Sequence, residues 1–83
     1  MTGLLGLILA AAACFPTPEI HAQLGDKYGE ARLAVGLSQS GNILEIWAGP
    51  SGSWTALVTR PDGTSCVVDV GQGMQVVTPG EPV

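Results

Sequence analysis

The sequence predicts an α+β fold in which one N-terminal amphipathic helix packs on an antiparallel β-meander of four to five strands. Near the N-terminus, apolar residues recur every four positions, which is typical of a helix with one buried face. From Arg32 onward the period changes to two, as in strands that bury one face. Short turns separate these strands, and turns of this length join antiparallel neighbours.

The helix is expected over Pro18 to Tyr28. Thr17 can cap its N-terminus, Pro18 suits the first helical position, and Glu19 faces the positive end of the helix dipole. Gly29 can end the helix in the left-handed conformation. The apolar stripe that would face the sheet consists of Ile20, Leu24 and Tyr28.

Four alternating segments are interpreted as strands, over Arg32 to Ser38, Ile43 to Ala48, Ser53 to Arg60 and Thr64 to Val70. Met74 to Val77 would add a short edge strand, and Thr78 to Val83 reads as a flexible tail. The clearest turn is Pro61-Asp62-Gly63. One domain over residues 14–77 is therefore expected.

Residues 1–13 form an uncharged apolar stretch that matches the core of an export signal, with small residues before a cut after Ala13. Two other outcomes stay open: a cut after Ala22, which would remove Cys14, or lipidation of Cys14. An uncleaved stretch could also hold the protein at a membrane, although it is shorter than the about 20 residues of a spanning helix. The expected location is the periplasm or the medium, with a membrane-anchored form facing the periplasm as the alternative.

The charge distribution excludes several partners. The net charge is −4, and the basic residues are scattered, which argues against binding nucleic acid or anionic lipid head groups. No metal site and no cofactor are expected, because His21 is the only histidine and the acidic residues do not cluster. His21 is expected at the surface or rim of the helix, and Glu30 is expected to form a local ion pair with Arg32. No nucleophile motif appears, and Gly71-Gln72-Gly73 does not precede a helix, so neither catalysis nor phosphate binding is indicated.

Several short motifs resemble small uncharacterised secreted proteins of alphaproteobacteria. They are Cys14-Phe-Pro, Tyr28-Gly29-Glu30-Ala31-Arg32, Gly52-Ser53-Trp54-Thr55 and Pro61-Asp62-Gly63-Thr64-Ser65-Cys66. The resemblance covers roughly Cys14 to Gly73 and brings no assigned activity. It implies that Cys14 opens the mature domain and that Cys14 and Cys66 both belong to it.

Cys14 and Cys66 are the only cysteines. In an exported protein an even count indicates a disulfide, which here would close a loop of about fifty residues. The alternatives are a lipidated Cys14 with a free Cys66, loss of Cys14, or two free thiols.

Trp47 and Trp54 flank one turn and are the side chains most suggestive of a binding role. If Leu44, Ile46 and Ala48 share the core face with Trp54, Ala56 and Val58, then Trp47 and Glu45 point outward as a partner-binding anchor. The other register packs Trp47 against Trp54. Trp54 itself is expected in the core or at its rim.

The sequence therefore favours a non-catalytic exported envelope module that binds a protein partner, with Trp47, Glu45 and Trp54 as the binding candidates. One alternative is an accessory subunit of a membrane complex, held by an uncleaved or lipidated N-terminus. Another is a small enzyme with a pocket lined by Glu30, His21 and Asp69.

Overall fold

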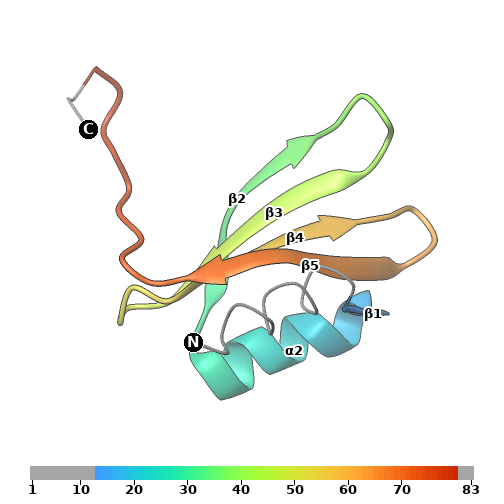
Figure 1. The fold of residues 1–83 in the computed structure, drawn as a ribbon, viewed down its shortest axis with the longest axis horizontal. Helices are drawn as coiled ribbons and strands as arrows, with labels where there is room; N and C mark the ends of the chain where they lie inside the picture. Colours follow the sequence, from blue (N-terminus) through green and yellow to red (C-terminus); the bar gives the residue numbers. More distant parts are fainter. Residues whose placement is uncertain (1–12, 81–83) are drawn as a thin grey trace, which may run out of the picture.

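The computed structural model describes residues 13–80 and contains one helix and one five-stranded antiparallel sheet. The elements are β1 (Cys14–Pro16), α2 (Thr17–Tyr28), β2 (Ala31–Leu37), β3 (Ile43–Ala48), β4 (Trp54–Thr59) and β5 (Thr64–Gly71). The strand order is β1-β5-β4-β3-β2, and α2 lies along one face of the sheet (Figure 1). The expected α+β class and the antiparallel sheet are confirmed.

The expected N-terminal position of the helix is wrong, because β1 precedes it. β1 pairs with β5 and supplies the fifth strand, in place of the edge strand expected over Met74 to Val77. β4 pairs with β5 on one side, and β1 pairs with the first three residues of β5, Thr64–Cys66, on the other. After β5 the chain turns away at Gly73, whose φ of 77° favours glycine, and Met74 to Val77 has no regular secondary structure.

α2 ends where expected, at Gly29, which has a φ of 64°. The backbone N–H groups of Gly29 and Glu30 donate to the last free carbonyls of the helix. Its start differs from the expectation, because Pro16 occupies the N-cap position and Thr17 is already helical. The Thr17 hydroxyl bonds to Ser65 across the helix–sheet interface instead.

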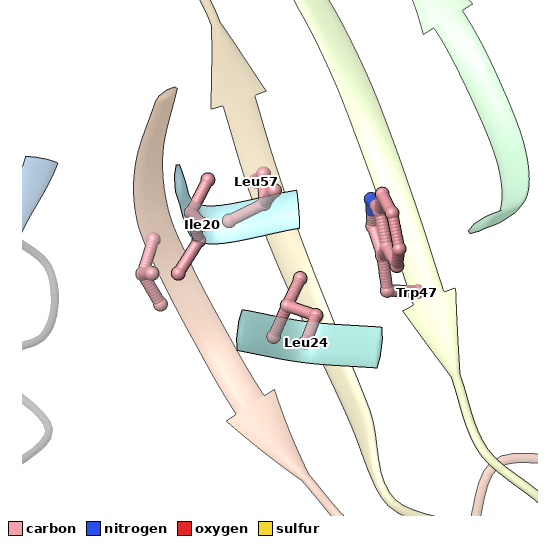
Figure 2. Packing of buried hydrophobic residues seen from close by; sticks show 5 residues of the cluster. Ile20, Leu24, Trp47 and Leu57 are labelled. Atoms are coloured by element: carbon pink, nitrogen blue, oxygen red, sulfur yellow. The ribbon is translucent and has the colours of Figure 1, made fainter. Parts of the chain in front are cut away.

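The core lies between α2 and the middle of the sheet (Figure 2). It consists of Ile20, Leu24, Trp47, Leu57 and Val67, with Phe15 packed against it. Tyr28, the third member of the expected apolar stripe, is exposed.

The β3–β4 register pairs Leu44 with Val58, Ile46 with Ala56 and Ala48 with Trp54. These six residues share one face of the sheet, as the first of the two expected registers predicts. That face is not the one α2 covers, because Trp47 and Leu57 lie in the core with the helix residues. Trp47 is therefore turned inward, and its expected outward orientation is wrong.

Cys14 and Cys66 stand opposite each other in the β1–β5 ladder and are joined by a disulfide, as expected. The disulfide attaches β1 to β5 immediately before the start of α2. Within residues 13–80, no helix is long and apolar enough to cross a bilayer. The expectations for residues 1–12 lie outside the described residues.

Candidate functional site

A buried carboxylate lies in the helix–sheet interface. Glu45 on β3 is 2% exposed, and its Oε1 accepts a hydrogen bond from the Trp47 indole N–H at 2.8 Å. His21 Nε2 on α2 lies 2.9 Å from the same oxygen. Oε2 accepts a hydrogen bond from the Thr59 hydroxyl on β4 at 2.8 Å. Because a buried carboxylate needs partners for both oxygens, these three contacts explain how β3 can bury a glutamate.

Two further hydroxyl contacts extend this cluster to the start of the helix. The Thr59 and Ser65 hydroxyls lie 2.6 Å apart, and those of Ser65 and Thr17 lie 2.8 Å apart. Ser65 is fully buried. The resulting chain of hydrogen bonds joins β3, β4, β5 and α2, and it fixes the helix in one position on the sheet.

The contacts of Glu45 also set its protonation. Burial alone would raise the pKa of its carboxyl group, but the hydrogen bonds from Trp47 and Thr59 and the nearby His21 together hold the pKa below its ordinary value. The carboxylate form is therefore the one that this interface stabilises. The His21 ring also contacts the Trp47 ring, with centroids 4.7 Å apart.

This cluster contains a histidine, a carboxylate and hydroxyl groups, but not in a catalytic arrangement. Ser65 bonds to Thr59 and Thr17, and no hydrogen bond between residues 13–80 joins His21 to a hydroxyl group. A nucleophile beside its base is the geometry that such chemistry requires. Within the described part of the chain, no group of three His, Cys, Asp or Glu side chains is placed to hold a metal ion.

The structure separates the residues that were expected to form sites. Trp47 and Glu45 are 8% and 2% exposed, so neither can serve as a surface anchor in this fold. Trp54 is half-buried at the end of the sheet, and its indole N–H donates to the Gln72 carbonyl at 3.2 Å. Asp69 pairs with Ala56 on the face away from the helix.

The expected ion pair between Glu30 and Arg32 does not form. Glu30 is buried while Arg32 is exposed, and the ion pairs within residues 13–80 are His21–Glu45 and Arg60–Asp62. His21 lies at the rim of the interface with 27% of its side chain exposed, and its bond to Glu45 had no signal in the sequence. Glu30 lines a cavity whose lining, among residues 13–80, includes neither His21 nor Asp69.

The outer edge of the sheet, formed by β2, is fully accessible. β2 is the last strand in the order, every one of its seven residues is exposed, and only β3 pairs with it. Val35 and Leu37 stand opposite Glu45 and Ile43, which puts them on the helix-side face of the sheet, beyond the reach of α2. We call Val35, Leu37 and Ile43 the apolar ledge; all three are exposed.

The opposite edge of the sheet is different. β1 has three residues, contains Pro16 and is joined to β5 by the disulfide. Short strands and prolines at an edge discourage pairing with another chain. The two edges are therefore unequal: within residues 13–80, β2 is unpaired along its whole outer side, whereas at the other edge β1 covers the Thr64–Cys66 part of β5. The sequence did not reveal this, because alternation predicts a strand but not its place in the order.

Comparison with known protein families, curated proteins and solved structures gave no match to this chain.

Proposed function

We propose that this chain is a non-catalytic exported module that binds a protein partner by adding one of the partner's strands to β2. The observation that carries the proposal is the open edge of β2. Its outer backbone N–H and C=O groups face no neighbouring strand among residues 13–80, and they are ready to pair with an extended segment.

The side chains of β2 support the same reading. Arg32 is the only charged residue in the strand, and Leu33, Val35 and Leu37 are all exposed. Soluble proteins usually protect such an edge with charges, proline or a covering element. The matching partner segment is an extended strand with alternating apolar side chains, because these would pack on the apolar ledge while the backbone pairs with β2.

Export is supported by the disulfide, which is consistent with an oxidising compartment. The proposed cut falls after Ala13. A cut after Ala22 would divide α2 between its buried residues Ile20 and Leu24 and would remove β1. Lipidation of Cys14 would use the sulfur that the disulfide already holds.

The binding proposal is tested by site-specific photo-crosslinking in cells that naturally produce the protein. A photoreactive residue replaces Leu37 on β2, and a second variant carries it at Val76, which is comparably exposed but lies outside the sheet. We expect position 37 to crosslink to a defined extended segment of one other protein, identified by peptide mass spectrometry. Position 76 should not give this product.

A second substitution tests whether strand addition causes the crosslink. Val35→Lys places a charge on the exposed edge without touching the core, so the fold should persist while pairing is lost. We expect the position 37 product to disappear in this variant and to survive the control Val76→Lys. A product that survives Val35→Lys would refute strand addition, and crosslinks to a second copy of the chain alone would replace the partner with a homodimer.

The export proposal has its own test, the intact mass of the protein isolated from those cells. A mass that begins at an unmodified Cys14, and that rises by two hydrogens on reduction, is expected. A mass that includes residues 1–13 or a lipid would instead support retention at a membrane.

A further inference from the structure

A cavity of about 450 Å³, partly open to solvent, lies between the C-terminal half of α2, the start of β4 and the end of β5. It is separate from the β2 edge, since no residue of β2 lines it. Buried Leu24 and Val67 contribute apolar surface, and Trp54 and Tyr28 also line it. Its volume is within the usual range of small-molecule sites and equals that of about 15 water molecules.

Two residues that line this cavity each have a buried polar atom without a hydrogen-bond partner. Glu30 Oε1 and Ser53 Oγ are both buried and have no hydrogen bond, and both residues line the cavity. Glu30 as a whole is only 5% exposed. Almost all buried polar atoms in proteins are hydrogen-bonded, so the unpaired carboxylate oxygen of Glu30, beside a cavity that its residue lines, points to a missing donor.

The two groups belong to neighbouring parts of the chain. The Gly29 carbonyl oxygen and Ser53 Oγ lie 3.0 and 3.4 Å from the same point, the position that a Cβ on Gly49 would take. Glu30 follows Gly29 directly. Glu30 and Ser53 therefore belong to adjoining segments of the chain, and both residues line the cavity.

The negative charge of Glu30 indicates that the missing hydrogen-bond donor is a cation. Neither of the ion pairs within residues 13–80 involves Glu30. A carboxylate buried without a cation is costly, and a cationic donor brought by a ligand removes that cost. An N–H donor with a positive charge also forms the stronger kind of hydrogen bond to a carboxylate.

From this geometry we infer that the cavity is a binding site for a small amphiphilic organic ammonium ion. Its apolar part packs against Leu24 and Val67, and its ammonium group donates hydrogen bonds to Glu30 and Ser53. The site goes beyond the proposed partner binding, since a protein strand on β2 and a small ligand in the cavity use different elements.

The test uses three probes of equal chain length and different head groups: hexylammonium, hexanol and hexanoate. Each is titrated into the full ¹⁵N-labelled chain with its disulfide formed, at constant ionic strength, and followed by NMR. The two indole N–H signals give an internal control, because Trp54 lines the cavity whereas the Trp47 N–H is bonded to Glu45. We expect hexylammonium to move the Trp54 signal and the amide signals of Ser53 and Glu30, with little change at Trp47.

The head group should decide the affinity. We expect hexylammonium to bind about tenfold more tightly than hexanol, as one charge-assisted hydrogen bond allows, and hexanoate to bind least. Equal affinity for the amine and the alcohol would overturn the assignment of a cationic ligand. This comparison uses the unmodified chain, so it does not depend on the folding of a variant.

Paired substitutions then assign the preference to one carboxylate. Glu30→Gln keeps the shape of the side chain and removes its charge, so it should abolish the tenfold preference and leave hexanol binding unchanged. The control Glu19→Gln removes an exposed carboxylate from the same helix and should change nothing. A preference that persists in Glu30→Gln, or NOEs that place residues 1–12 of the chain inside the cavity, would overturn the inference.

Discussion

Reduction of the Cys14–Cys66 disulfide should remove a large part of the stability of this domain. The bond joins residues separated by 52 positions, and the chain-entropy relation for a loop of that length gives about 4 kcal/mol at 25 °C. Small domains are stable by about 5–15 kcal/mol in total. The bond also holds β1, which pairs with β5 through only three residues. Its loss therefore removes a restraint on the unfolded chain and also weakens one edge of the folded sheet.

The assay is thermal unfolding by circular dichroism, with and without a phosphine reductant. For a domain of this size, each kcal/mol shifts the melting temperature by about 4–8 °C, so we expect a fall of roughly 15–30 °C. The double variant Cys14→Ala/Cys66→Ala should melt near the reduced protein, and reductant should not change its melting temperature. This variant separates loss of the bond from other effects of the reductant.

Alkylation shows whether the bond was present in the first place. Both thiols should react with iodoacetamide only after reduction. A reduced protein with two alkylated thiols that still melts within about 4 °C of the oxidised form would refute the entropic argument, because about 4 kcal/mol cannot be hidden in so small a shift.

Three further substitutions probe the interface and the sheet. Glu45→Gln should cost about 1–3 kcal/mol at pH 7 and should flatten the loss of stability in acid, measured by urea unfolding between pH 7 and pH 3. The folded pKa of Glu45 is below its ordinary value of 4.5, so the carboxylate stabilises the fold above that pH and loses this effect as the pH falls further. Gly71→Ala should cost about 1–3 kcal/mol and change tryptophan fluorescence, because its Cβ would lie 2.7 Å from a carbon of the Trp54 ring. Leu57→Ala, at a fully buried position, should cost about 2–5 kcal/mol in the same unfolding assay.

Each of these substitutions has a control variant or an outcome that would contradict it. An equally steep acid dependence in Glu45→Gln would assign the effect to another carboxyl group. Gly36→Ala adds a Cβ that meets nothing within 4 Å, so it should leave fluorescence unchanged. Leu37→Ala removes a leucine that is 79% exposed and should cost no more than about 0.5 kcal/mol. Similar costs for Leu57→Ala and Leu37→Ala would contradict the core described here.

Much of the fold was predictable because it depends on local signals. Alternation located four strands to within one or two residues, and glycine at position 29 marked the end of the helix. The short strand β1 could not be predicted in this way. Three residues carry no period, and β1 exists because β5 offers a free edge and Cys14 lies opposite Cys66.

The binding candidates were harder to predict, for a specific physical reason. β3 and β4 carry apolar residues on both faces, so alternation gives the register but not the face that the helix covers. The choice of face depends on Glu45, which needs the Trp47 indole, the Thr59 hydroxyl and His21 around it. His21 and Thr59 lie 24 and 14 positions from Glu45 in the sequence, and only the folded chain brings them to it.

The same choice of face accounts for the surfaces that remain open. A single helix of 12 residues can cover only part of one face of a five-stranded sheet, and here it covers the part around Trp47, Leu57 and Val67. The apolar ledge and the β2 edge lie beyond it on the same face, although their residues are as apolar as those in the core. Apolar strand residues that are exposed at an unpaired edge promote association with other chains. A partner strand on β2 would extend the sheet, pair the free backbone groups of β2 and cover the ledge, which is why this edge, rather than Trp47, carries the binding proposal.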